Sequence, residues 1–224
     1  MNKTLSFVKL DYMTIKTYLS WKTVLLFLVV FAFMGYGTGE VSALIGVAMM
    51  YSTIFACYPF AIGDKNGIDT LYATLPITKK TVVTGRYAFS LLLNGFMAAA
   101  SFGVSAILMP AFGKTFHLKT TLLTVLLCFA LFSILEAVQL PLYFKLGYAR
   151  AKFLAYLPLA VFPAAVLGAS SLLGKGRMLP IIESILTWSQ NNIIFTAVFA
   201  VVIWASAMLL SGVLSFRFYQ KREF

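Results

Sequence analysis

Long runs of apolar residues, separated by short polar segments, dominate the pattern of this chain. A helix that crosses a bilayer needs about 20 predominantly apolar residues, and the sequence contains six runs of about that length. Each run predicts a helix, because a spanning segment must satisfy its backbone hydrogen-bonding groups without water. The predicted spans are residues 18–36, 41–62, 87–112, 120–142, 153–173 and 193–214.

The composition supports the same interpretation. Hydrophobic residues make up 61% of the 224 positions and charged residues only 11%, whereas soluble domains average roughly half and a quarter. This balance excludes a soluble enzyme, a disordered region and a disulfide-rich secreted module. Cys57 and Cys128 lie inside apolar runs and are typical of small buried residues. We therefore expect an all-α membrane protein in which residues 1–224 form a single transmembrane domain.

The distribution of positive charge predicts the orientation. The formal net charge is +11, from 18 Lys and Arg against 7 Asp and Glu. With the N-terminus inside, fourteen of these cations lie on the cytoplasmic side, and the outer side carries only Lys114, Lys119, Lys175 and Arg177. Cytoplasmic loops are enriched in Lys and Arg, so we expect a multi-pass protein of the cell membrane with both termini cytoplasmic. The cations face lipid headgroups rather than nucleic acid, because no basic run is interleaved with aromatic residues.

The first 19 residues predict an amphipathic helix that lies in the cytoplasmic interface. Their apolar residues recur at alternating steps of three and four, which places them on one helix face. Residues 174–192 predict a short outer helix at the headgroup level. The predicted apolar face of the first segment consists of Leu5, Val8, Tyr12, Ile15 and Leu19.

The longest cytoplasmic loop, residues 63–86, contains a second amphipathic segment. A turn signal at Asn66-Gly67 precedes it, Pro76 ends it, and Thr78 is placed to cap the helix that follows. An apolar stripe on so short a helix lies either on lipid or in a groove of a cytoplasmic partner. The stripe, at positions i, i+3, i+4 and i+7, consists of Ile68, Leu71, Tyr72 and Leu75.

Two blocks of sequence resemble the motifs of small type-2 ABC exporter permeases. These are six-helix membrane subunits of bacterial peptide exporters, such as the phenol-soluble modulin and bacteriocin exporters. The first block comprises Tyr58-Pro59-Phe60, Asp64-Lys65-Asn66-Gly67-Ile68, Leu71-Tyr72-Ala73-Thr74-Leu75-Pro76-Ile77 and Arg86-Tyr87. The second block is Pro141-Leu142-Tyr143-Phe144-Lys145-Leu146-Gly147 at the end of the fourth predicted span.

The resemblance implies a division of labour between several subunits. The loop after the second span would form a coupling helix that docks on an ABC ATPase, and residues 1–19 would form the family's elbow helix. ATP and magnesium would be bound by two copies of that ATPase, and a second permease half, identical or related, would complete the translocation path. The substrate would be an amphipathic peptide or a lipid-like molecule. The coupling role would fall on Ile68, Asp69, Leu71, Tyr72 and Leu75.

The residues themselves predict no catalytic, cofactor or metal site in this chain. We therefore expect that the chain is not an enzyme. Gly113-Lys114-Thr115 has the tail of a phosphate-binding loop, but Leu108 occupies the position of its first glycine. His117 is the only histidine, so a histidine-based zinc site is excluded. No Ser lies in a G-x-S-x-G elbow.

Glu136 is the one carboxylate well inside a predicted span, and such residues face protein or water rather than lipid. It is the middle one of three polar residues spaced three apart along the fourth span, between Ser133 and Gln139. Two interpretations are open. Glu136 forms a structural ion pair with a cation such as Arg86, Lys145 or Arg150, or it lines a substrate pathway.

Two other functions remain as alternatives to an exporter permease. A stand-alone secondary transporter or channel would be expected to carry several intramembrane ionisable groups and repeated, broken helices. The single Glu136 and the lack of a visible repeat disfavour it. A non-transporting membrane anchor or immunity subunit would need the same docking loop, so the sequence does not separate it from a permease.

Overall fold

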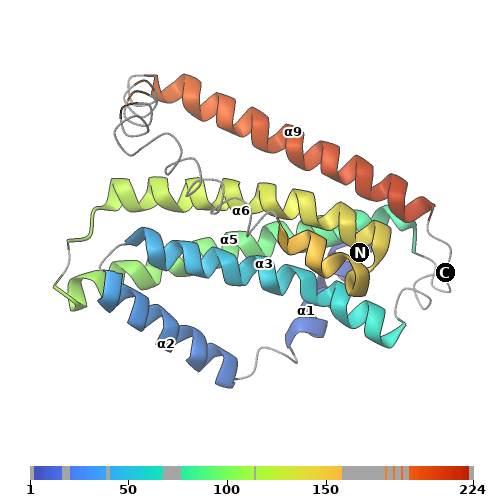
Figure 1. Cartoon of the computed structure of the whole chain (residues 1–224), viewed down its shortest axis with the longest axis horizontal. Coiled ribbons are helices and arrows are strands. Elements are labelled where there is room, and N and C mark those ends of the chain that lie inside the picture. Colours follow the sequence, from blue (N-terminus) through green and yellow to red (C-terminus); the bar gives the residue numbers. More distant parts are fainter. Residues whose placement is uncertain are drawn as a thin grey trace.

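The structure is a computed structural model that describes residues 3–16, 21–38, 41–67, 77–113, 115–157, 180, 184, 188 and 192–221. All regular structure in these residues is helical, and a helical stretch at residues 148–157 follows α6. The helices are α1 (Lys3–Lys16), α2 (Trp21–Thr38), α3 (Val41–Asn66), α5 (Lys79–Ala111), α6 (Leu118–Leu146) and α9 (Ile193–Gln220) (Figure 1).

Within the described residues, four helices are long and apolar enough to cross a membrane. They are Val41–Asn66, Lys79–Ala111, Leu118–Leu146 and Val198–Gln220, and they coincide with the second, third, fourth and sixth predicted spans. The predicted first span falls on the 18-residue helix α2, which is not among these four. Most of the predicted fifth span, residues 153–173, lies outside the described residues. An all-α, multi-pass membrane protein is therefore confirmed, and the number six stays a prediction.

All four spanning helices are longer than their apolar runs, and the ends of α5 and α6 show why. Helix α5 begins at Lys79 instead of residue 87, because Thr78 caps it: the Thr78 hydroxyl oxygen accepts a hydrogen bond from the Thr81 N–H (3.2 Å). Helix α6 continues through Pro141 to Leu146 and ends at Gly147, whose φ of 75° favours glycine. The predicted cap at Thr78 is confirmed.

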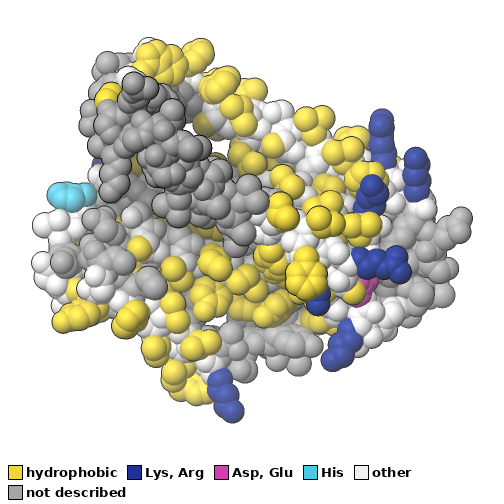
Figure 2. Space-filling view, in the orientation of Figure 1, with side chains coloured by type: hydrophobic (Ala, Val, Ile, Leu, Met, Phe, Trp, Pro, Cys, Tyr) yellow, Lys and Arg dark blue, Asp and Glu magenta, His cyan; other side chains and the backbone are white. Residues whose placement is uncertain are grey.

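The helices pack as a bundle with α5 near its centre. Helix α9 lies along one side against α6, while α2 lies on the other side against α3 (Figure 1). One core cluster joins α1, α5, α6 and α9 near the end where α5 begins, and a second joins α2, α3 and α5 towards the opposite end. Figure 2 shows Lys and Arg gathered mainly at the first of these ends and His117 at the other, with apolar side chains between.

Helix α1 docks on α5 and leaves part of the predicted apolar face exposed. The chain does form a helix here, but Leu5 and Tyr12 are 62% and 54% exposed. The buried positions are Phe7, Asp11 and Ile15, spaced i, i+4 and i+8. Of these three, only Ile15 belongs to the predicted apolar face, and the placement of this helix in the membrane interface stays a prediction. The apolar residues Leu5 and Tyr12 point away from the protein instead.

The α1–α5 contact depends on a glycine, and this generates a test. A Cβ atom at Gly85 would lie 2.6 Å from Cδ1 of the buried Phe7, whereas one at Gly95 on the same helix would meet nothing within 4 Å. Both alanine substitutions gain roughly 0.5–1 kcal/mol from reduced chain entropy. We expect Gly85→Ala to be less stable than Gly95→Ala by about 1–3 kcal/mol, the range for overpacked sites. Thermal unfolding of both purified variants in detergent measures the difference, and equal melting temperatures would contradict the close approach.

Candidate functional site

The five residues predicted to couple to an ATPase, Ile68, Asp69, Leu71, Tyr72 and Leu75, lie outside the described residues. The structure does place the two ends of their loop. Gly67, with φ of 62°, follows the last residue of α3, and Ile77 and Thr78 precede α5. Both ends therefore lie at the basic end of the bundle, next to Lys65 and Lys79 (Figure 2).

Near the described ends of this loop, a buried arginine joins three helices. Arg86 on α5 is 4% exposed, and its Nη1 lies 3.1 Å from Oδ1 of Asp11 on α1. Its guanidinium carbon lies 4.6 Å from the ring centroid of Phe60 on α3 and 5.6 Å from that of Phe7 on α1. A guanidinium between two aromatic rings and a carboxylate is held by both charge and cation–π attraction. Arg86 therefore ties α1 and α3 to the start of α5.

The Asp11 carboxyl group is unusual because burial opposes its ionisation. Asp11 is 1% exposed, and its contact with Arg86 is not aligned as a hydrogen bond, so neither oxygen accepts one from the described residues. Burial raises the pKa of Asp11 from its ordinary value of 3.8 to about 6, and the attraction of Arg86 opposes that rise only in part. The pair therefore fixes the position of α1 at an energetic cost, as is common for buried ion pairs.

The structure corrects the expected ion pair of Glu136. Arg86 pairs with Asp11, Lys145 lies 5.1 Å from the ring centroid of Phe218, and no salt bridge to Glu136 occurs in the described part of the chain. Glu136 on α6 is instead buried against α5, where its Oε2 accepts hydrogen bonds from Ser90 Oγ and from Asn94 Nδ2 (2.8 Å). Neutral donors thus take the place of the expected cation.

Asn94 extends this contact into a network across three helices. Its Oδ1 accepts a hydrogen bond from Ser52 Oγ on α3 (2.5 Å), and its Nδ2 also approaches Ser133 Oγ on α6 (3.4 Å). Gln139 is buried as well, but its Nε2 has no hydrogen-bond partner among the described residues. The structure therefore brings Ser133 and Glu136 together through Asn94 and leaves Gln139 outside the network.

A second polar contact, which the sequence reasoning missed, joins α9 to the bundle. The Tyr87 hydroxyl on α5 lies 2.5 Å from Ser211 Oγ and 2.8 Å from Ser215 Oγ, both on α9. Ser211 also donates a hydrogen bond to the Ala137 carbonyl on α6. Two serines one helical turn apart, Ser211 inside the sixth predicted span and Ser215 just after its end, were the available signal. Hydrogen bonds between helices stabilise such bundles because lipid offers no competing partners.

These contacts position helices and contain no arrangement for covalent chemistry. The described residues include no group of three or more His, Cys, Asp or Glu that could hold a metal ion. The residues brought together are a carboxylate, an amide and several hydroxyls on α3, α5 and α6. They can stabilise one packing of the helices, and they can be rearranged when the helices move.

The fold and its buried polar contacts define the class of this protein, a multi-pass helical membrane protein. The sequence model of a family described as ABC-2 family transporter protein matches residues 6–220, nearly the whole chain. The chain therefore belongs to the ABC-2 family of transporter membrane proteins, which confirms the family resemblance found in its motifs. A search among curated proteins finds no match.

The raised pKa of Asp11 predicts a pH dependence of stability. Between pH 3.8 and about 6 the folded state binds more protons at Asp11 than the unfolded state. The contribution of this group to stability is thus complete below about pH 4 and is lost as the pH rises through 6. The loss is on the order of 3 kcal/mol. Because Asn carries no proton to lose, the wild type should lose this amount relative to Asp11→Asn between pH 4 and 7. Unfolding of both proteins in detergent measures the difference, and a constant difference would contradict the burial argument.

The Glu136 contacts predict a contrast between two substitutions. In Glu136→Gln the amide oxygen still accepts from Ser90 and Asn94, so the free energy of unfolding should stay within about 1 kcal/mol of the wild type. Glu136→Leu removes the acceptor of both donors; Ser90 loses its partner and Asn94 keeps only the longer contact with Ser133, so the cost should be about 1–3 kcal/mol for each lost hydrogen bond. Thermal unfolding measures both values. A stable Glu136→Gln protein that assembles with its ATPase but loses substrate-stimulated hydrolysis would contradict a purely structural role and place Glu136 in the pathway.

Proposed function

We propose that the chain is the membrane-spanning permease subunit of an ATP-driven exporter that moves an amphipathic substrate, such as a peptide, out of the cell. The observation that carries this proposal is the match of residues 6–220 to an ABC-2 transporter family. The membrane subunits of ABC transporters work with a separate ATPase, and the residues of this chain predict no nucleotide-binding loop. The working unit comprises two permease halves and two ATPase subunits, in the cell membrane with both termini cytoplasmic.

The loop between α3 and α5 is the proposed docking site for the ATPase. The apolar face of Ile68, Leu71, Tyr72 and Leu75, with Asp69 beside it, fits a groove on a protein partner. The position of the loop ends at the basic end of the bundle supports this assignment, since that end is cytoplasmic by the distribution of Lys and Arg.

The contacts of Arg86 supply a mechanical route from the docking loop to the bundle. Arg86 lies two turns after the first residue of α5, and it binds Asp11 of α1 and the Phe60 ring of α3. A push on the loop would therefore move the ends of α3 and α5 together with α1, the proposed elbow helix. Such contiguous contacts transmit displacement when the packed elements have two discrete arrangements. ATP hydrolysis at the ATPase would thereby change the conformation of the substrate path, which is a coupling free energy between two distant sites.

Two alternatives are distinguished from this proposal by experiment. A stand-alone transporter would transport without any ATPase. An anchor or immunity subunit would bind a partner but would not stimulate ATP hydrolysis in response to substrate. Reconstitution of the chain with its ATPase in vesicles, followed by measurement of substrate-stimulated hydrolysis, separates all three.

We expect the double substitution Leu71→Ala and Tyr72→Ala to release the ATPase subunit or abolish its substrate response. A few large apolar or aromatic anchors dominate an interface, and each costs on the order of 2 kcal/mol or more when it is truncated. Tyr72 suits this role because its ring can be buried while its hydroxyl finds a polar partner. Co-purification with the ATPase and ATP hydrolysis in lipid measure the effect.

A matched control is available on α1. Leu5 and Tyr12 are an exposed leucine and tyrosine that point away from the bundle, so the pair Leu5→Ala and Tyr12→Ala should leave ATPase binding unchanged. If the loop variant is folded and retains the ATPase at wild-type stoichiometry with a normal substrate response, the loop lies on lipid and the docking assignment is wrong.

A further inference from the structure

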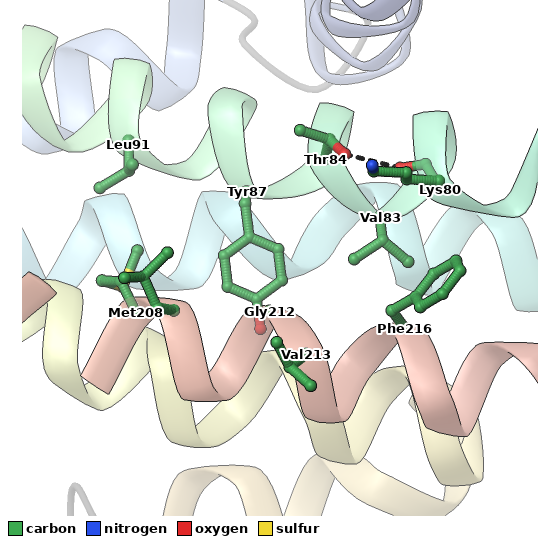
Figure 3. A pocket seen from close by; sticks show the side chains of 10 residues that line it. Lys80, Val83, Thr84, Tyr87, Leu91, Met208, Gly212, Val213 and Phe216 are labelled. Atoms are coloured by element: carbon green, nitrogen blue, oxygen red, sulfur yellow. Dashed lines mark hydrogen bonds between the residues drawn. The ribbon is translucent and has the colours of Figure 1, made fainter. Parts of the chain in front are cut away.

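An apolar groove runs along the bundle between α5 and α9. Its volume is about 410 Å³, and it is open on one side. Figure 3 shows its walls, with Val83, Tyr87 and Leu91 on the α5 side. Met208, Gly212 and Phe216 line the α9 side.

Two features keep the groove open and its walls apolar. Gly212 has no side chain, and a Cβ atom built there would meet nothing within 4 Å, so the glycine leaves the hollow open. Apart from Lys80, the polar side chains of the walls already have hydrogen-bond partners. The Thr84 hydroxyl donates to the Lys80 carbonyl (2.6 Å), and the Tyr87 hydroxyl is hydrogen-bonded to Ser211 and Ser215. A ligand in this groove therefore meets hydrocarbon, which suits an alkyl chain.

One end of the groove carries a cation with no counter-ion. Lys80 lies in the first turn of α5 at the basic end of the bundle, is exposed, and forms no ion pair with any described residue. Its neighbour Lys79 is engaged differently, because its Nζ donates to the Gln220 carbonyl (3.1 Å) at the end of α9. The ammonium group of Lys80 therefore lies at one end of the apolar groove.

The dimensions of the groove match those of one lipid leaflet. From Lys80 to Leu91 the axis of α5 rises by about 16 Å, at 1.5 Å per residue. Half of a bilayer, headgroups included, is about 20 Å thick. Lys80 therefore lies at the headgroup level when Leu91 lies inside the hydrocarbon. A single chain that enters beside Lys80 reaches most of the way through its leaflet.

We propose that this groove binds one acyl chain of an anionic phospholipid whose phosphate pairs with Lys80. The positive charge of Lys80 selects an anionic headgroup over a zwitterionic one, and the apolar walls hold the chain. The exposed cation at one end of an apolar groove favours a lipid over a second copy of the chain, because a single anionic phospholipid supplies both the counter-charge for Lys80 and the alkyl chain for the walls. This inference does not rest on the proposed export activity.

The test uses the purified full-length chain in detergent, titrated with phosphatidylglycerol or with phosphatidylcholine that has the same acyl chains. Bound lipid is counted by native mass spectrometry, and the oligomeric state is read from the same spectra. We expect one phosphatidylglycerol per chain, bound about fivefold more tightly than phosphatidylcholine, since one Lys near a membrane surface contributes about 1 kcal/mol.

Two variants separate the charge from the cavity. Lys80→Gln should remove the fivefold preference for phosphatidylglycerol, and Gly212→Leu should fill the groove and abolish the tight binding of both lipids. The matched controls are Lys9→Gln, at an exposed cation on α1, and Gly103→Leu, where a Cβ atom likewise meets nothing within 4 Å. Both controls should bind lipid as the wild type does.

Three results would overturn the proposal. They are equal binding of the two lipids by the wild type, retention of the preference in Lys80→Gln, and unchanged lipid binding in Gly212→Leu. If Gly212→Leu instead dissociates a dimer while lipid binding persists, the groove is an interface between copies of this chain.

Discussion

The arrangement of the basic end depends on one guanidinium that cannot lose its charge. Arginine stays protonated in proteins, so Arg86, 4% exposed on α5, must be compensated wherever it is buried. Asp11 supplies the countercharge from α1 and Phe60 supplies an aromatic face from α3. Because lipid provides no hydrophobic force between helices, such contacts carry much of the specificity of packing. The close fit of Phe7 on Gly85 secures the same junction from the side of α1.

Hydropathy predicted the spanning helices well because the bilayer imposes its composition on a whole segment. Helices α3, α5, α6 and α9 each contain one of the predicted apolar runs. The predicted apolar run begins at residue 87, whereas α5 begins at Lys79, directly after the predicted cap Thr78. Its first two turns contain Lys, Thr, Gly and Arg; Thr78 caps the first turn, and Arg86 forms an ion pair with Asp11 of α1. Hydropathy counts these residues as loop, whereas local capping and a distant partner make them helix.

The polar partners could not be read from the sequence, because spacing predicts a shared face but not what lies opposite. Ser133, Glu136 and Gln139 were grouped by a period of three, while an α-helix has 3.6 residues per turn. Over six residues the direction of the side chain drifts by about 120°, so Gln139 points away from the direction of Ser133. Ser133 and Glu136 accordingly meet Asn94, and Gln139 does not. Asp11 was missed because Arg86 lies far from it in the chain, and a lone acid on a basic helix resembles a solvated residue.

Helix α5 takes part in each of the three buried polar clusters that join helices at these sites. It contributes Arg86 to the junction with α1 and α3, Asn94 to the network with α3 and α6, and Tyr87 to the contact with α9. It also packs against each of the other five named helices. A helix of 33 residues is about 50 Å long, and satisfied polar contacts along it resist independent movement of its neighbours. Helix α5 begins soon after the loop at residues 68–76. A displacement of that loop would therefore move α5 first, and then the helices that pack against it. This architecture favours movement of the bundle as a few coupled bodies, which an ATP-driven permease requires.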